Sequence, residues 1–118
     1  MGAEKTLHAG KTILVADYRG AQRLADQLAL LEDLAAHVES SPERTLILQN
    51  FDGVFVPTEF VNRAYALGDK YRARIARMAI LGADGLKRLL VQSYIAVSGN
   101  RDVRTFEREA EALEWLVE

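Results

Sequence analysis

The sequence predicts an α/β domain, with an open sheet of four to five mostly parallel strands that alternate with four helices. Short apolar runs alternate four times with segments of helical periodicity, and strands separated by helices usually run parallel with right-handed crossovers. A chain of 118 residues can build one core but has little surface left for a second. Its 49% hydrophobic and 27% charged residues are typical of a folded chain. We therefore expect one domain over residues 1–118.

The first part of the chain predicts a β-ribbon and then a helix. In KTLHAGKTILVADYRG, the pair Ala9-Gly10 favours a two-residue hairpin turn, because glycine readily takes the positive φ that such turns need. The apolar run 13–15 has the length of a strand buried on both faces. Residues 22–40 are expected to be an amphipathic helix, from the three- and four-residue spacing of Leu24, Leu28, Leu31, Ala35 and Val38.

The middle of the chain repeats the pattern. The segment SSPER ends the first helix, and residues 45–48 form a second short apolar strand. A second helix follows and ends near residues 68–70, and residues 75–81 form a third strand. The second helix is predicted from the spacing of Phe60, Ala64, Leu67 and Tyr71.

The last part predicts a third helix, a short strand and a fourth helix. Gly99 closes the third helix, since glycine most easily takes the left-handed conformation that ends helices. Residues 103–106 form the strand and residues 109–117 the last helix. The third helix is expected from the spacing of Leu86, Leu89, Leu90, Ser93 and Val97, and the fourth is expected to turn Ala110, Leu113 and Leu116 or Val117 inward.

Composition excludes several functional classes. The absence of cysteine excludes disulfides, cysteine-ligated zinc and a thiol nucleophile. His8 and His37 lack metal-ligand spacing, so we predict neither a metal nor another cofactor. A net charge of −2 gives no reason to expect nucleic acid as a partner. The charged N-terminus and the lack of an apolar run of roughly 18 to 20 residues predict a cytoplasmic protein without a transmembrane segment.

The segment LQNFDGVFVPTEF joins the second strand to the second helix. Pro57 disfavours helix at the residue before it, so Thr58 is expected to cap the helix or simply to enter it. The alternative is a helix start that contacts a partner or carries a phosphate, which the positive end of the helix dipole would favour. Glu59 is expected to act as a first-turn acid that complements the same dipole.

The loop at residues 82–85, before the third helix, has two interpretations. It resembles a glycine-containing loop whose amides could receive phosphate, but a carboxylate at Asp84 is better suited to capping the third helix. The ligand interpretation would use Gly82, Asp84, Gly85 and Lys87.

A cluster of basic residues lies around the start of the third strand. It is expected to be a solvated approach to that strand, or else a surface for an acidic protein, a phosphorylated ligand or an anionic lipid. Arg72 and Arg74 would share one face if the segment is extended. The cluster comprises Lys70, Arg72, Arg74 and Arg77.

Aromatic side chains gather around the strand-helix junction. Phe51, Phe55 and Tyr65 are expected in the core, and any that is exposed would form a patch for a partner or a second copy in a homodimer.

Several local sequences together resemble the STAS superfamily. They are GKTILVADYRG at residues 10–20, DGVFVPTEFV at 52–61, MAILGADGLKRLL at 78–90, VSGN at 97–100 and FEREAEALEWL at 106–116. The superfamily includes anti-sigma-factor antagonists and the cytoplasmic domains of sulfate transporters. The chain looks closest to its short stand-alone bacterial branch, the SpoIIAA-like or STAS/SEC14 proteins.

The resemblance implies a regulatory site that this chain carries in altered form. In the antagonists, an Asp-Ser-Ser-Gly-like segment at a helix start bears the phosphorylated serine and docks on a kinase. Aligned with that segment, Thr58 falls at the first serine, Glu59 at the phosphorylated one, and Phe60 replaces the glycine. Glu59 at that position could also fix one signalling state. The family's phosphorylatable serine is absent here.

The resemblance and the residues together predict a non-enzymatic regulatory or protein-interaction module. Its alternative is a SEC14-like module for a lipid or small apolar ligand, although a core of this size has difficulty sparing several hundred Å³. A hydrolase would need polar side chains that converge on His8 or His37. The expected partner surface comprises Asp52, Phe55, Thr58, Glu59 and Arg63.

Overall fold

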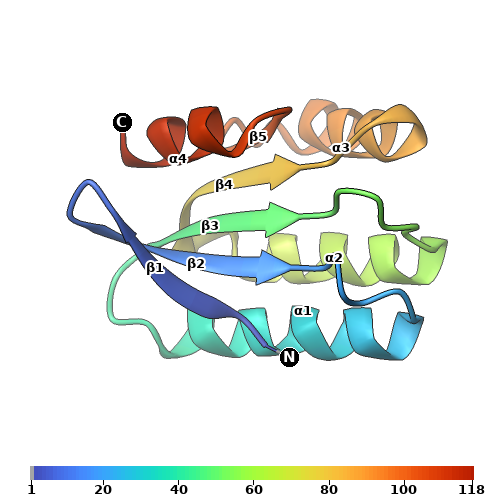
Figure 1. Cartoon of the computed structure of the whole chain (residues 1–118), viewed down its shortest axis with the longest axis horizontal. Coiled ribbons are helices and arrows are strands. Elements are labelled where there is room, and N and C mark those ends of the chain that lie inside the picture. Colours follow the sequence, from blue (N-terminus) through green and yellow to red (C-terminus); the bar gives the residue numbers. More distant parts are fainter. Residues whose placement is uncertain (1) are drawn as a thin grey trace.

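Five strands form one mixed sheet in the computed structural model, which describes residues 2–118 (Figure 1). The strand order β1-β2-β3-β4-β5 follows the chain, with β1 antiparallel to β2 and all other neighbours parallel. The predicted α/β fold and its alternation of strands and helices are confirmed. The elements are β1 (Glu4–His8), β2 (Lys11–Asp17), α1 (Leu24–Ser40), β3 (Thr45–Asn50), α2 (Thr58–Lys70), a 3₁₀ turn η1 (Arg72–Arg74), β4 (Ile75–Leu81), α3 (Gly85–Ser98), β5 (Val103–Phe106) and α4 (Glu109–Val117).

The helices divide between the two faces of the sheet. Because the parallel strands follow one another in order, right-handed crossovers place α1, α2 and α3 on one face. Residues from these three helices share one apolar cluster with Leu14 and Ile47, which are paired across β2 and β3. Ile13 and Leu48 point to the other face and pack with α4. Both faces of the central strands are buried, as their short apolar runs predict.

The β1-β2 hairpin turns at Ala9-Gly10, as predicted. Ala9 has φ +50° and Gly10 has φ +78°, and His8 pairs with Lys11 on either side of them. Two positive φ values in a two-residue loop define a type I′ turn, whose twist matches that of the flanking strands.

The inward faces of α3 and α4 differ from the sequence pattern. On α4 the buried residues are Ala112, Trp115 and Leu116, so the expectation for Ala110, which is exposed, is wrong. On α3, Leu89 and Val97 are 60% and 91% exposed. The α3 residues that pack against the sheet are Val91, Tyr94 and Ile95. The side chain of Leu86 lies outside the described part of the chain.

The arginines around the start of β4 contact helix ends and do not form an extended approach to the strand. Residues Arg72–Arg74 form η1, which contradicts the shared extended face expected for two of its arginines. Arg72 donates to the Ser98 carbonyl at the end of α3 (3.0 Å), and Arg74 donates to three carbonyls at the end of α1. Arg77 donates to the Trp115 carbonyl in the last turn of α4. These cations satisfy carbonyls at the negative ends of three helix dipoles, which explains the cluster structurally.

Candidate binding site

The candidate site lies at one edge of the sheet, where three parallel strands end. β2, β3 and β4 point the same way in Figure 1, and their last residues are paired in register, Asp17 with Asn50 and Asn50 with Leu81. The loops that follow these strands therefore lie together. In open α/β sheets, ligands commonly bind outside the carboxyl ends of the strands.

The loop after β3 is held to its neighbours by backbone hydrogen bonds. The Phe51 N–H donates to the Leu81 carbonyl (2.9 Å), and the Val54 N–H donates to the Phe51 carbonyl (3.0 Å). On the other side, the Tyr18 N–H donates to the Asn50 carbonyl (2.9 Å). The loop has a defined conformation because its neighbours on both sides satisfy its polar groups.

Two side chains from different helices also hold this loop. Gln27 of α1 is buried and donates from Nε2 to the Phe55 carbonyl (2.9 Å). Lys87 of α3 donates from Nζ to the carbonyls of Phe51 (3.0 Å) and Val54 (3.1 Å). The backbone from residue 51 to residue 55 is therefore fixed from both α1 and α3.

Gly82 brings the two segments singled out in the sequence into direct contact. A Cβ at this position would lie 2.3 Å from the Asp52 nitrogen and 2.5 Å from its Cα, and the residue has φ +75°. Only glycine fits both the space and the conformation. The loop at 82–85 thus packs backbone to backbone against the start of the junction.

The five residues predicted for a partner surface are all exposed. Phe55 stands out because 77% of it is accessible, which contradicts its expected place in the core. Thr58 is the first residue of α2 and makes no side-chain cap, so the capping interpretation is wrong and simple helix entry holds. Arg63 forms an ion pair with Glu32 of α1 (2.7 Å), which raises the pKa of the Arg63 guanidinium. The five are Asp52, Phe55, Thr58, Glu59 and Arg63.

The residues of the predicted ligand loop have separate roles. Asp84 occupies the N-cap position of α3, but its side chain caps no amide, so the expected capping is wrong. Its carboxylate lies 3.5 Å from the Lys87 ammonium instead. Gly85 begins α3 with φ +51° and has open space around it. The Lys87 side chain extends toward the loop carbonyls and is mostly shielded from solvent.

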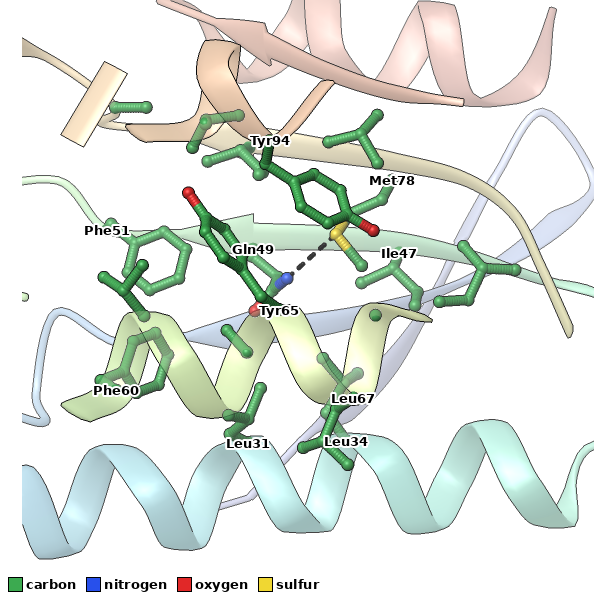
Figure 2. Close-up of a pocket in the computed structure, with 18 of the residues that line it drawn as sticks. Leu31, Leu34, Ile47, Gln49, Phe51, Phe60, Tyr65, Leu67, Met78 and Tyr94 are labelled. Carbon is green, nitrogen blue, oxygen red and sulfur yellow. Dashed lines mark hydrogen bonds between the residues drawn. The ribbon is translucent and has the colours of Figure 1, made fainter. Parts of the chain in front are cut away.

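A cavity of about 130 Å³ lies beside this loop, between α2, α3 and strands β3 and β4 (Figure 2). Its walls are mostly aliphatic and aromatic side chains. Phe51 and Phe60 close one end, while Leu67 and Ile47 line the other part. Small-molecule sites share this concave, mostly apolar form, although they are usually larger, at about 300–1,000 Å³.

Two tyrosines span the space between α2 and α3 and line the cavity. The rings of Tyr65 and Tyr94 are stacked with their centroids 4.8 Å apart. Tyr65 donates to the Leu90 carbonyl of α3, and Tyr94 donates to Asp69 of α2 (3.2 Å). Burial raises the pKa of both hydroxyls, which therefore stay neutral and able to donate. The two helices meet through these large rings, and this arrangement leaves the space beneath them.

Gln49 places a neutral polar group in the wall of the cavity. Gln49 of β3 directs its Nε2 at the Met78 sulfur (3.1 Å, dashed in Figure 2) and accepts a hydrogen bond from the Tyr18 hydroxyl (3.1 Å). Burial raises the Tyr18 pKa well above its ordinary value, so this donor also stays protonated. A thioether is a weak acceptor, so the Gln49 amide could serve a ligand atom at small cost.

Sequence reasoning did not locate the cavity. The two tyrosines lie on different helices, and no spacing rule relates them. Local signals exist for single lining residues, namely Gln49 within an apolar strand, Tyr65 among the aromatics near the junction and Lys87 in the predicted ligand loop. The junction was found because a strand end, a proline and a helix start are visible locally.

Within residues 2–118, no three His, Asp or Glu side chains gather as a metal site. His37 lies 2.9 Å from the Asp33 carbonyl one turn earlier in α1. No helix in the described residues has the length and apolarity needed to cross a membrane.

Comparison with solved structures identifies the class of fold. An anti-sigma-factor antagonist (STAS) domain protein from Planctomyces limnophilus matches with a TM-score of 0.61 and 15% identity, over 100% of each chain. At that identity the match shows the fold alone, a STAS-like α/β domain. The search of curated proteins finds no match.

The family follows from the sequence model. The SpoIIAA-like family model matches residues 8–117, nearly the whole chain. The chain belongs to the SpoIIAA-like family. This confirms the resemblance derived from its local sequences.

Proposed function

We propose that this protein is a non-enzymatic binding module whose cavity between α2 and α3 holds a small apolar molecule. The cavity itself carries this proposal, with a volume of about 130 Å³ and walls that are almost entirely apolar. A dry apolar cavity of about 150 Å³ in another protein is large enough to bind benzene. The sequence argued against a ligand site because a core of this size has difficulty sparing a pocket of several hundred Å³. A small ligand needs much less volume than that.

The expected affinity is modest. A ligand the size of one aromatic ring buries about 150 Å² of apolar surface, which at about 25 cal/mol/Å² gives about 4 kcal/mol. The cost of association reduces that gain, so dissociation constants near or above about 1 mM are expected for the simplest apolar probes. Tighter binding would require polar contacts as well.

Filling the cavity should abolish binding. Ala64 lines the cavity on α2, whereas Ala66, two residues later, is exposed on the same helix. We expect Ala64→Leu to lose binding of benzyl alcohol, measured by ligand-detected NMR, and Ala66→Leu to retain it. Equal binding by the two variants would refute the cavity as the site. Native mass spectrometry of freshly purified protein would show whether a natural ligand remains bound.

A second candidate function is docking of a protein partner at the junction, residues 52–63. The observation that favours it is Phe55, which is 77% exposed although its loop is held by Gln27 and Lys87. A large aromatic side chain on a fixed backbone is typical of residues that dominate binding energy at interfaces. STAS domains typically bind proteins, which agrees with this function.

Single substitutions separate partner docking from a structural role. Phe55→Ala or Glu59→Lys should weaken capture of a partner and change the free energy of unfolding by less than about 1 kcal/mol. Leu7→Ala is the matched control, because Leu7 is 74% exposed but lies in β1, beside the start of β2. A protein that is captured by wild type and by Leu7→Ala, but not by Phe55→Ala, would be a partner that docks at Phe55. Identical capture by all variants would refute docking at Phe55.

We further propose that the junction works without a phosphorylation switch. Thr58, Glu59 and Phe60 stand where the resemblance places the phosphorylated segment of antagonists. Glu59 lies in the first turn of α2, where its charge complements the helix dipole. Intact-mass measurement of protein from growing cells should show no phosphate. A phosphorylated species lost in Thr58→Ala would contradict this.

A further inference from the structure

We propose that the ligand of the cavity is an amphipathic acid, with an apolar body in the cavity and a carboxylate at Lys87. This inference rests on the proposed function, because it specifies the chemical class of the same ligand. It assigns the ligand's orientation as well, with the acidic group toward the loop after β3 and the apolar body toward the tyrosines.

Lys87 is the only charged residue among the described residues that line the cavity. Its side chain is 19% exposed. All other described lining residues are apolar or neutral, so no carboxylate in the walls would repel an acid. A cationic ligand would be repelled by the Lys87 ammonium, and a neutral ligand would form no ion pair with it.

The ammonium has one N–H that the protein uses poorly. Of its three donors, two go to the carbonyls of Phe51 (3.0 Å) and Val54 (3.1 Å). The remaining partner is Asp84, at 3.5 Å, which is longer than a normal charged hydrogen bond. The side chain of Asp84 is 81% exposed, so solvent already satisfies it and it can leave at little cost.

A ligand carboxylate would improve on this arrangement. It could approach the ammonium to ordinary hydrogen-bond distance from the cavity side, where the walls are mostly apolar. Charge-assisted hydrogen bonds are roughly twice as strong as neutral ones, and low local polarity strengthens them. The mostly buried Lys87 ammonium would then gain the close counter-charge that Asp84 does not provide.

The test compares benzoate with benzyl alcohol at neutral pH, by NMR titration against wild type and Lys87→Met. The ratio of the two dissociation constants measures the preference for the acid, and each ligand has the same ring. We expect Lys87→Met to reduce that preference by about tenfold or more, the worth of one charge-assisted hydrogen bond. Lys87→Arg should retain the preference for benzoate. Lys5→Met, on the exposed part of β1, is the matched control and should behave as wild type.

The outcomes distinguish this inference from the proposed function. If both ligands bind wild type and the preference is the same in Lys87→Met, the acidic class is wrong but the apolar site remains. If neither ligand binds wild type, the proposed function itself fails. Binding of benzyl alcohol by Lys87→Met verifies that its cavity is intact. Should that variant not fold, Asp84→Asn replaces it: removing the competing carboxylate should tighten benzoate binding by about threefold and leave binding of benzyl alcohol unchanged. Equal effects on both ligands would overturn the inference.

Discussion

Replacement of Gly82 by alanine should destabilise the protein far more than the same change at Gly53. Both residues have positive φ, +75° and +69°, so both substitutions force alanine into a left-handed conformation. The surroundings differ. A Cβ on Gly53 would meet no atom within 4 Å, whereas one on Gly82 would lie 2.3 Å from the backbone nitrogen of Asp52. The pair therefore separates backbone strain from the close contact between the two loops.

The magnitude follows from what must move. Backbone strain costs about 1 kcal/mol at either position. At Gly82, one loop must also shift by about an ångström to restore ordinary contact. That shift would break the Phe51 N–H hydrogen bond to the Leu81 carbonyl (2.9 Å), and a buried polar group left without a partner costs about 1–3 kcal/mol. We expect a loss of about 3 kcal/mol for Gly82→Ala and about 1 kcal/mol for Gly53→Ala.

Urea unfolding followed by circular dichroism measures both values. A domain of this size has a free energy of unfolding of about 5–15 kcal/mol, so both variants should remain folded in water. The unfolding midpoints should differ clearly while the slopes stay similar. Equal losses for the two variants would show that the 82–85 loop does not pack tightly on the junction. The candidate site would then lack the backbone contact between Gly82 and Asp52 on which its description rests.

Three further predictions concern the core, the acid limit and the orientation of α3. Tyr18→Phe should cost about 1–2 kcal/mol in urea unfolding, because it leaves a buried glutamine oxygen without its donor. The side-chain hydrogen bond from Arg19 lowers the pKa of Asp17, so ionised Asp17 stabilises the fold above its unfolded pKa, and this stability is lost as the pH falls through the lower folded pKa. Asp17→Asn should therefore be less stable than wild type near neutral pH, and thermal melts in acid should show a smaller difference between the two. Leu90→Ala, at the cavity, should lower the free energy of unfolding by about 1–3 kcal/mol, whereas Leu89→Ala, 60% exposed, should change it by less than about 0.5 kcal/mol. Similar losses for the two leucines would show that α3 is rotated.

The order of elements was predictable because each signal is local. The hairpin at Ala9-Gly10 and the end of α3 at Gly99 follow from backbone preferences of single residues. Strand burial followed from apolar runs too short for a helix. The face of a helix is less secure, since α4 buries Trp115 instead of turning Ala110 inward. An aromatic ring that covers a large apolar area outweighs a regular spacing of small residues.

Side-chain partners across the fold were not predictable, because they depend on how the layers meet. Thr58 and Asp84 have the residue types of helix caps, yet neither caps a helix. Arg72 and Arg74 suggested a basic patch, but they bond helix carbonyls more than twenty residues away in sequence. Lys87 was placed in a ligand loop on the basis of local sequence, while its contact with Phe51 comes from the packing of α3 on the sheet edge.

Lys87 connects the two candidate functions physically. Lys87 lines the cavity, and its ammonium holds the carbonyls of Phe51 and Val54, directly before the exposed Phe55. An acid bound to the third N–H would draw the ammonium toward itself and so weaken its hydrogen bonds to these two carbonyls. Gln27 would still hold the Phe55 carbonyl from α1, so the loop would be loosened on one side only. If a bound ligand changes partner docking, the change should therefore disappear when Lys87 is replaced. If the cavity and the docking surface act independently, the ligand should not change docking in any variant.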